Sequence, residues 1–347
     1  MVIVAFNSAD VILGCVESLM NSEGPRPHVV VVDNASPDAT VALLEQWASG
    51  RAEQVSADDL PFDPGVVRKP LKLARFRRGD RPVAAELGDV AILEAGANRG
   101  FAGGVNLGLE LLAGIPEVRH FWVLNPDTIV APGAVQALLA AADRMPEYGL
   151  MGGRVLYAEA PHRVQIDGGR INRWTGVTHN VNLGADPAAV PPPRGEDLDF
   201  IMGANLVASR AFYDRVGPMR EDYFLYYEEA DWAMRRGDMP LVVAPGFVIW
   251  HHAGTAIGSP TLERLASPFS FWFKYRSRMK FIRRFNPVGL PVAMAYATAK
   301  AGQLLLKGAW PQAGALLRAT WGLPAPRSVR ERLSPEAARI AFSRARR

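Results

Sequence analysis

The sequence predicts an α/β protein whose mostly parallel sheet is flanked by helices. Over the first 150 residues, short apolar runs alternate with helical patterns, an order typical of the strand–helix units that build a parallel sheet. Residues 29–32 are four consecutive valines, as in a strand buried on both faces. In this chain of 347 residues, 49% apolar and 21% charged residues exclude a disordered or fibrous protein, and the single cysteine excludes a disulfide scaffold.

Each predicted element rests on a local pattern. The apolar runs lie between polar or turn-forming residues, and they predict strands over 2–5, 29–32, 91–93, 121–124 and 241–243. Segments with apolar residues at helical spacing predict helices over 10–20, 37–47, 104–112, 132–142 and 229–236. Ser36 and Pro37 suit the cap and first turn of the second helix, and Gly237 suits the end of the last.

Three regions interrupt this alternation. Residues 51–90 contain a basic stretch and several prolines, and we expect them to form a surface insertion. Residues 160–200 are rich in loop-forming residues. From residue 269 onward the composition becomes basic, aromatic and rich in Ala and Leu. We therefore expect a main domain over 1–268 and a helical C-terminal region over 269–347.

The charge is distributed unevenly along the chain. Residues 274–347 contain 16 Lys and Arg and two acidic residues, so this segment carries +14 and residues 1–273 carry −10. A basic tail on an acidic body indicates a polyanionic partner, either an anionic membrane surface or a nucleic acid. The basic residues of 274–284 alternate with aromatic ones, as in a helix at a membrane interface. Since no nucleic-acid-binding motif accompanies them, we expect a membrane and no nucleic acid.

Two polar motifs follow predicted strands, at the edge where open α/β sheets bind ligands. Asp33 comes directly after the valine strand, where its carboxylate can accept hydrogen bonds from a ribose or a base; capping the next helix is the alternative. The glycines of residues 98–106 precede a helix, where they let the backbone approach a diphosphate at the helix N-terminus. A simple loop is the alternative there.

Two further motifs carry carboxylates. Asp127 follows the strand over 121–124, where it can hold a divalent cation that bridges phosphates; a turn cap is the alternative. Glu228, Glu229 and Asp231 open a helix after an aromatic run. Aromatic neighbours raise the pKa of a carboxyl group, which suits a general base, although acids also stabilise helix N-termini.

In this order and spacing, the motifs resemble glycosyltransferase family 2, whose nucleotide-sugar-binding fold is called GT-A. The likeness is strongest to bacterial rhamnosyltransferase-like enzymes of cell-envelope polysaccharide synthesis. The motifs are Val-Asp-Asn-Ala-Ser at 32–36, Asn-Arg-Gly-Phe-Ala-Gly-Gly-x-Asn at 98–106, Leu-Asn-Pro-Asp at 124–127 and Tyr-x-Glu-Glu-x-Asp-Trp at 226–232. The resemblance runs from residue 2 to about residue 287, without 51–90, and implies a GT-A catalytic domain over 1–268.

The resemblance implies an inverting transfer of a sugar, rhamnose first, from a nucleotide diphosphate to a hydroxyl of a saccharide or polyprenyl-diphosphate-linked acceptor. By this resemblance, Glu229 matches the catalytic base, Glu228 is the alternative candidate for the base, and Asp231 orients the acceptor or the base. Donor-binding roles are implied for Ala5, Phe6, Asn7, Asp33, Asn98, Gly100, Gly104, Asn125 and Asp127. Asp127 and His251 match the positions of a divalent metal, Mg²⁺ or Mn²⁺. Asn125 stands where the family's metal motif has an acid, which weakens the expectation of a metal.

Two other functions fit parts of the sequence. A sugar nucleotidyltransferase needs a basic, glycine-rich segment after the first strand, which residues 7–10 lack. A catalytically inactive GT-A domain that acts as a binding scaffold is compatible with Asn125. We expect a cytoplasmic protein, peripheral at the inner face of the cell membrane, because no secretory signal precedes the first strand and the apolar stretch 288–306 is interrupted by Lys300 and Gln303. The sequence leaves the oligomeric state open.

Overall fold

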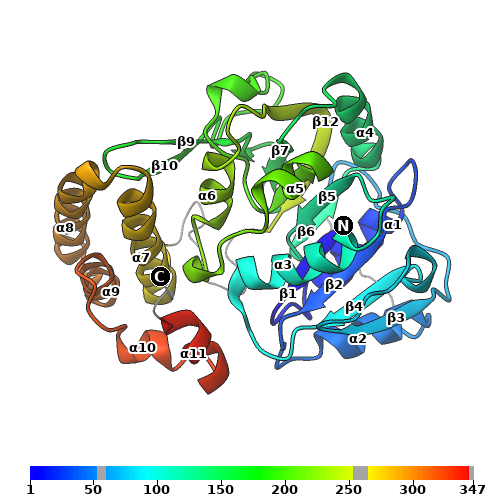
Figure 1. The fold of residues 1–347 in the computed structure, drawn as a ribbon, viewed down its shortest axis with the longest axis horizontal. Coiled ribbons are helices and arrows are strands. Elements are labelled where there is room, and N and C mark those ends of the chain that lie inside the picture. The colour runs from blue at the N-terminus through cyan, green and yellow to red at the C-terminus, as the bar shows by residue number, and fades with distance from the viewer. Residues whose placement is uncertain (53–59, 253–264, 344–347) are drawn as a thin grey trace.

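The computed structural model describes residues 1–52, 60–252 and 265–343. A large mixed sheet forms the centre of the molecule, with helices on both faces (Figure 1). The strands are β1 (Val2–Ala5), β2 (Val29–Asp33), β3 (Leu73–Arg77), β4 (Val90–Glu94), β5 (His120–Leu124), β6 (Thr128–Val130), β7 (Leu150–Tyr157), β8 (Val164–Ile166), β9 (Gly169–Ile171), β10 (Thr178–Asn180), β11 (Asn205–Ser209) and β12 (Leu241–His251).

The helices of the described residues cover the sheet and then continue as a separate helical group. They are α1 (Ile12–Met20), α2 (Thr40–Ala48), α3 (Gly100–Ala113), α4 (Ala134–Arg144), α5 (Arg210–Val216), α6 (Glu228–Met234), α7 (Pro268–Phe285), α8 (Leu290–Leu306), α9 (Trp310–Thr320), α10 (Arg327–Arg330) and α11 (Pro335–Phe342). All five predicted strands and all five predicted helices are present, with bounds shifted by at most four residues, except that β12 continues to His251 beyond its predicted end at 243.

The order of the sheet is β3-β4-β2-β1-β5-β11-β7-β12-β6, with β8 added beside β7, and β9 and β10 form a separate pair. Strands β3, β4, β2, β1 and β5 are parallel to one another. Strand β11 is antiparallel to both β5 and β7, and β7 is parallel to β12. The carboxyl ends of β1, β2, β4, β5 and β12 therefore meet at one edge of the sheet. The expected mostly parallel α/β fold is confirmed, with β11, β6 and β8 as antiparallel strands.

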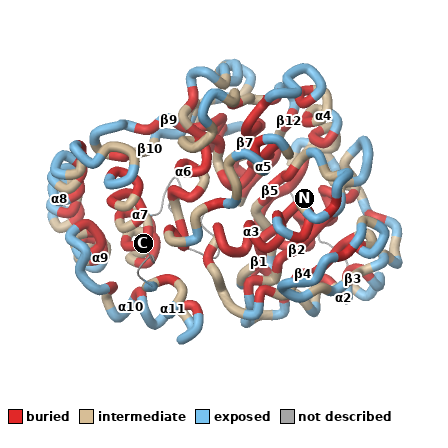
Figure 2. The backbone as a smooth tube through the Cα atoms, viewed as in Figure 1, coloured by how far each residue is buried: buried red, intermediate tan, exposed pale blue. Residues whose placement is uncertain are grey.

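The valine strand explains how the sheet acquires two covered faces. Side chains alternate along a strand, so Val29 and Val31 enter the core under α1, α2 and α4, and Val30 and Val32 enter the core under α3, α5 and α6. All four valines are buried, as Figure 2 shows for the centre of the sheet. Burying one such side chain stabilises the fold by about 1.5–3 kcal/mol.

The segment 51–90, expected to be a surface insertion, contributes a strand to the sheet. Residues 53–59 lie outside the described part, but 60–90 contain β3, which extends the sheet by parallel pairing with β4. Arg75 pairs with Glu45 of α2 at 2.5 Å and with Glu94 of β4 at 3.2 Å. Arg75 and Arg77 therefore make β3 a charged edge strand, which discourages pairing with other chains.

The C-terminal region is helical as expected, but α7 does not present its aromatic and basic face to the outside. Phe269, Trp272 and Phe273 are buried in a third core that α7 shares with α8, α9 and α11. Arg278 is only 4% exposed. The expectation that 274–284 forms an interfacial helix is thus wrong for α7, because packing against the main domain uses that face. Within the described residues, no helix is long and apolar enough to cross a membrane.

Candidate active site

A cavity of about 670 Å³ lies along the edge where the carboxyl ends of the strands meet. Its wall includes residues that follow β1, β2, β4 and β5, the end of β12, the start of α6, and parts of the C-terminal region. The predicted residues that line it are Phe6, Asn7, Asn98, Gly100, Asn125, Asp127, Glu228, Glu229 and His251. This volume is within the usual range of small-molecule sites.

The first wall is built by the turns after β1, β2 and β4. Asn34 Nδ2 donates to the Gly100 carbonyl at 3.0 Å, and the Arg99 amide donates to Asn34 Oδ1 at 3.0 Å. Asn98 Oδ1 accepts from the Gly100 amide at 2.9 Å. Gly100 has a φ of +72°, and a Cβ there would lie 2.2 Å from the Phe224 carbonyl oxygen. The glycine therefore lets the start of α3 contact the loop before α6.

Three predicted donor-binding residues lie outside the cavity wall. Ala5 is fully buried within β1. Asp33 Oδ1 accepts from the Ser36 amide at 3.0 Å, the turn-capping role given as its alternative. A Cβ on Gly104 would lie 2.5 Å from Val4 Cγ1, so this glycine allows α3 to pack closely on β1. Their proposed contacts with a donor gain no support from the cavity, because none of the three lines it.

Asn125, Asp127 and His251 meet at the second wall. His251 Nδ1 lies 2.6 Å from Gln165 Oε1, which accepts only from a protonated nitrogen. In the neutral form of this tautomer, the lone pair of Nε2 is directed toward Asp127 Oδ1 at 3.1 Å and Asn125 Nδ2 at 3.2 Å. Two Lewis-basic atoms at this separation suit a shared cation.

The donor set at this wall is small. Within the described ranges, the side chains form no group of three or more His, Cys, Asp or Glu that could hold a metal. The residues present fit a divalent ion that takes its other ligands from the phosphates of a substrate, as Mg²⁺ commonly does. Gln165 was not singled out in the sequence, because no pattern in the irregular 160–200 region reveals that it contacts His251.

Glu228 and Glu229 form the third wall, at the start of α6. Glu228 is 3% exposed, and its Oε2 has no hydrogen-bond partner among the described residues. Burial, followed by the charge of Glu229, raises the pKa of Glu228 well above its usual value. Burial also raises the pKa of Glu229, while backbone hydrogen bonds and the charge of Lys274 oppose the rise. Both carboxyl groups thus have the raised proton affinity of a general base.

The loop directly before these two glutamates has a strained backbone. Phe224, Tyr226 and Tyr227 all have φ values between +66° and +72°, which side chains other than glycine rarely adopt. Helix α7 holds this loop: Ser277 Oγ donates to the Leu225 carbonyl at 2.8 Å, and Arg278 Nε donates to the Tyr227 hydroxyl at 2.9 Å. The surrounding packing therefore fixes a backbone that the sequence alone would not favour.

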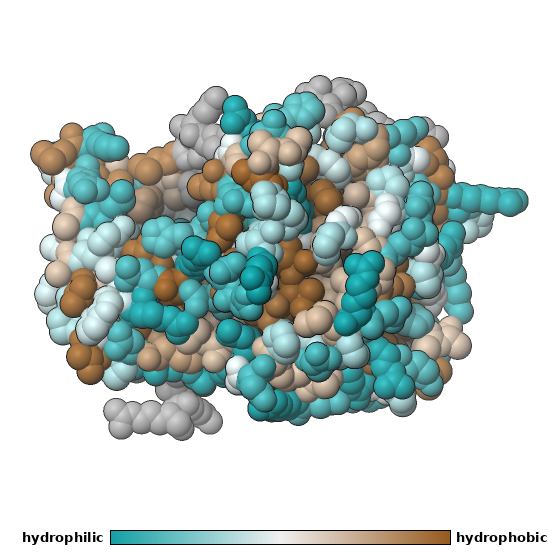
Figure 3. Space-filling model, turned by 90° about the horizontal axis from the view of Figure 1, so that it is seen from above, coloured by the Kyte–Doolittle hydropathy of each residue, from teal (hydrophilic) through white to brown (hydrophobic). Residues whose placement is uncertain are grey.

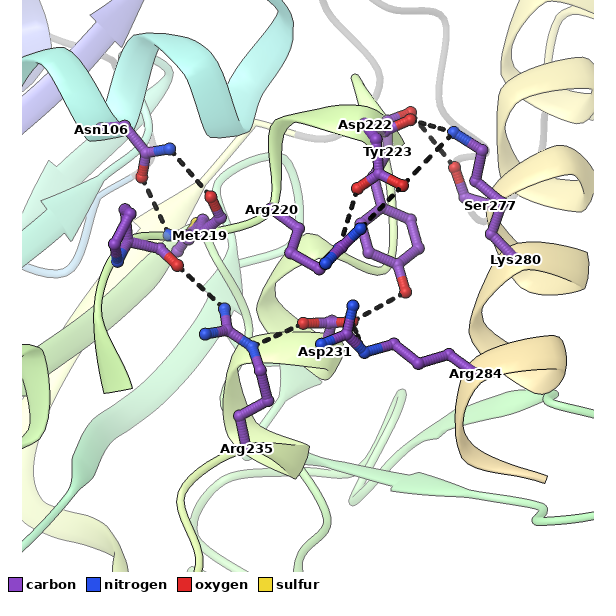
Figure 4. Close-up of polar contacts among 11 residues, drawn as sticks. Asn106, Met219, Arg220, Asp222, Tyr223, Asp231, Arg235, Ser277, Lys280 and Arg284 are labelled. Carbon is purple, nitrogen blue, oxygen red and sulfur yellow. Dashed lines mark hydrogen bonds and ion pairs between the residues drawn. The ribbon is translucent and has the colours of Figure 1, made fainter. Parts of the chain in front are cut away.

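Asp231 faces away from the cavity. It is fully buried and bonds the Tyr223 hydroxyl at 2.9 Å, Arg235 at 2.7 Å and Arg284 of α7 at 3.3 Å (Figure 4). Asp222, in the segment before α6, pairs with Lys280 of α7 at 3.9 Å. Asp231 lies outside the cavity wall, so the structure gives no support to direct orientation of an acceptor. Its ion pair with Arg284 links α6 to α7, because the arginines satisfy its buried charge.

Comparisons with known proteins agree with the motifs. The sequence model described as Glycosyl transferase family 2 matches residues 1–61. An N-acetylglucosaminyl-diphospho-decaprenol L-rhamnosyltransferase of Mycobacterium tuberculosis is 28% identical over 205 residues, which are 52% of this chain and 64% of that protein. The succinoglycan biosynthesis protein ExoO of Rhizobium meliloti is 42% identical over 76 residues, 22% of each chain. The matches thus span less than two thirds of these relatives.

The fold has a counterpart among solved structures. The crystal structure of GalNAc-T7 with UDP, GalNAc and Mn²⁺ superposes with a TM-score of 0.54, at 12% identity, over 87% of this chain and 50% of that one. At this identity the likeness concerns the fold, which is the GT-A arrangement of a mostly parallel sheet flanked by helices. The matched segment, the relatives and the fold together confirm the resemblance to glycosyltransferase family 2 and its rhamnosyltransferase-like members.

Proposed function

We propose that the protein is an inverting glycosyltransferase that moves a sugar from a nucleotide diphosphate to a hydroxyl of a saccharide or polyprenyl-diphosphate-linked acceptor. One observation carries the proposal: a single cavity brings the pair Glu228 and Glu229 together with Asp127 and His251. Such a cavity provides a proton acceptor and a place for an anionic leaving group. Rhamnose is the first candidate sugar, since the Mycobacterium tuberculosis relative is named as an L-rhamnosyltransferase.

The roles of the residues follow from the walls that they form. Phe6, Asn7 and Asn98 would contact the nucleoside, and the N-terminus of α3 at Gly100 would face its phosphates. Asp127 and His251, with Asn125, would hold the divalent ion, and that ion supplies charge neutralisation for the departing diphosphate. Cell-envelope glycan synthesis is the setting that the relatives suggest.

The proposed reaction is a single displacement at the anomeric carbon. The acceptor oxygen forms a bond to this carbon from the side opposite the diphosphate, and the bond from the carbon to the phosphate oxygen breaks. The electron pair of the broken bond leaves with the nucleoside diphosphate, and the acceptor proton passes to Glu229. Glu229 is the better base because it is partly exposed to the cavity, whereas Glu228 is buried beneath it. Near-attack positioning by the cavity walls supplies part of the rate enhancement.

Substitution of the two glutamates tests the assignment. In Glu229→Gln the turnover number should fall by about 10²–10⁴-fold, because the amide cannot accept the proton. Glu228→Gln should retain more activity, and both variants should bind dTDP or UDP as the wild type does. The measurements are nucleotide release with a sugar nucleotide and a lipid-linked acceptor, and calorimetric nucleotide binding. Normal turnover in Glu229→Gln contradicts the base assignment, and nucleotide binding without any transfer by the wild type favours an inactive scaffold.

We further propose that the membrane contact lies on α8 and α9, not on α7. Helices α8 and α9 lie at the left end of the molecule in Figure 1, and Figure 3 shows hydrophobic side chains at that end. On and beside these helices, Leu306, Trp310 and Trp321 are exposed by 90%, 66% and 57%. Lys300 and Lys307 lie on or next to α8. Exposed tryptophans beside basic residues are typical of helices that bind the interface of an anionic membrane. A lipid-linked acceptor would reach the cavity from such a surface.

A further inference from the structure

The C-terminal region contributes two cations to the cavity wall. Lys274 comes from the middle of α7, and Arg332 comes from the segment between α10 and α11. Phe269 and Leu333 lie beside them in the same wall, and the Arg332 guanidinium stacks over the Phe269 ring at 4.8 Å. These four residues belong to none of the family motifs, so the C-terminal region closes a part of the site that the motifs leave open.

Lys274 differs from the other basic residues of α7. Lys280 and Arg284 pair with Asp222 and Asp231, and Arg278 bonds the Tyr227 hydroxyl. Lys274 is half-buried, and within the described part of the chain it forms no ion pair with a carboxylate. Burial, and then the charge of Arg278, lowers its pKa to about 8. An ammonium kept in such a place without a carboxylate partner is costly unless an anion binds there.

The wall that contains Asp127 and His251 already provides a place for one anion, the diphosphate of the donor. Asp127 and His251 suit a metal-bound diphosphate, and they belong to the strand edge. Lys274 faces the cavity near Glu229, whose charge acts on it, and Arg332 lines the same cavity over Phe269 of the helix that carries Lys274. Since Glu229 marks the position of the acceptor hydroxyl in the proposed function, we assign the part of the wall formed by Lys274 and Arg332 to the acceptor side.

We propose that Lys274 and Arg332 form a binding site for the diphosphate of a prenyl-diphosphate-linked acceptor. This inference rests on the proposed function, because the acceptor side is defined by Glu229. A lysine ammonium provides a compact charge and an arginine guanidinium a planar fork, and together they suit the oxygens of two adjacent phosphates. The site would select an anionic acceptor over a neutral saccharide.

The test measures binding of geranyl diphosphate while the nucleotide site is occupied. The protein is saturated with Mg²⁺ and whichever of dTDP and UDP binds more tightly, and geranyl diphosphate is titrated by calorimetry. The wild type should bind this probe, and Lys274→Met with Arg332→Met should weaken binding by about tenfold or more, as expected for loss of charged hydrogen bonds. Arg332→Met alone, at an exposed position, should lower the affinity several-fold without affecting folding.

A control variant and a measurement of nucleotide affinity separate the proposed acceptor site from the donor site. Arg283→Met with Arg330→Met removes two exposed cations from α7 and α10, and it should leave both affinities unchanged. The nucleotide affinity of the Lys274 and Arg332 variants should stay within about twofold of the wild type. Loss of nucleotide binding would show that the pair holds the donor and would overturn the proposal, as would unchanged or absent binding of geranyl diphosphate. A failure of the proposed function would appear instead as nucleotide binding by the wild type without any transfer of sugar to the acceptor.

Discussion

At the scale of single residues, the site combines two neighbouring carboxyl groups of different exposure. Glu228 Oε2 is buried without a hydrogen-bond partner in the described structure, whereas Glu229 is partly exposed in the same cavity. A buried carboxylate in this state costs free energy of folding, because water no longer solvates its charge. An ionised Glu228 therefore lowers the stability of the folded protein, since burial raises its pKa.

Substitution of Glu228 should reveal this cost through its pH dependence. Because its folded pKa is raised, the folded protein binds the proton more tightly than the unfolded chain does. The stability linked to this proton is present at low pH and is lost as the pH rises from the unfolded value through the folded pKa. Glu228→Gln should therefore be more stable than the wild type at pH 8, by about 1–3 kcal/mol, and the gain should shrink toward pH 5. Thermal unfolding at both pH values measures this.

An exposed glutamate provides the control for that comparison. Glu147→Gln changes the same group at the surface and should leave the unfolding temperature close to that of the wild type at both pH values. A Glu228→Gln protein that is less stable than the wild type at pH 8 would contradict the unsatisfied burial of this carboxyl group.

At the scale of elements, α3 is placed by glycines and α6 by α7. Gly104 and Gly108 let α3 approach β1, since a Cβ at either position would lie 2.5 Å from a valine side chain. This approach brings the N-terminus of α3 to the cavity and to the Phe224 loop. On the other side, Ser277 and Arg278 of α7 hold the loop that precedes Glu228. The separation of the two walls thus depends on packing far from the reacting atoms.

Gly104→Ala distinguishes a packing role from a contact with the donor. The added methyl group should lower the unfolding free energy by about 1–3 kcal/mol, because Val4 is buried and cannot move aside. The affinity of the remaining folded protein for dTDP or UDP should stay within a few-fold. Gly302→Ala in α8, where nothing lies within 4 Å of the new Cβ, should be neutral or slightly stabilising. If Gly104→Ala instead lost nucleotide affinity tenfold while keeping normal stability, a contact between Gly104 and the donor would be supported.

At the scale of the whole molecule, the C-terminal region joins the main domain through α7 and faces outward through α8 and α9. The basic residues of α7 stabilise the loop before α6 and the wall of the cavity. Exposed apolar side chains gather instead on α8, on α9 and just after them, at Val292, Leu306, Trp310, Trp321 and Leu323. The basic residues of α7 are therefore engaged within the molecule, and the proposed membrane contact is left to the exposed apolar side chains of α8 and α9 with Lys300 and Lys307 beside them.

Vesicle binding tests this arrangement. The protein should co-sediment with vesicles that contain anionic lipid at low salt, and high salt should weaken the binding because it screens the basic residues. Trp310→Ser with Trp321→Ser should reduce binding by about tenfold, while Trp174→Ser, which removes a 54% exposed tryptophan from the main domain, should have no effect. Equal loss in both variants, or no binding by the wild type, would contradict the assignment of the membrane face to α8 and α9.

The sequence by itself determined the α/β architecture and the strand edge that holds the site. Local periodicity in the sequence indicates strands and helices. It therefore placed Asn125 and Asp127 after β5, and Glu229 at the start of α6, before any contact was known. Only the tertiary structure decided which polar residues face the cavity. Asp33, Gly104 and Asp231 fit the motifs but lie outside the cavity wall, where they cap a turn, allow close packing and form ion pairs. Gln165, Lys274 and Arg332 line the cavity from distant segments. Local patterns fix the period of a segment, whereas the face that a side chain presents depends on long-range packing.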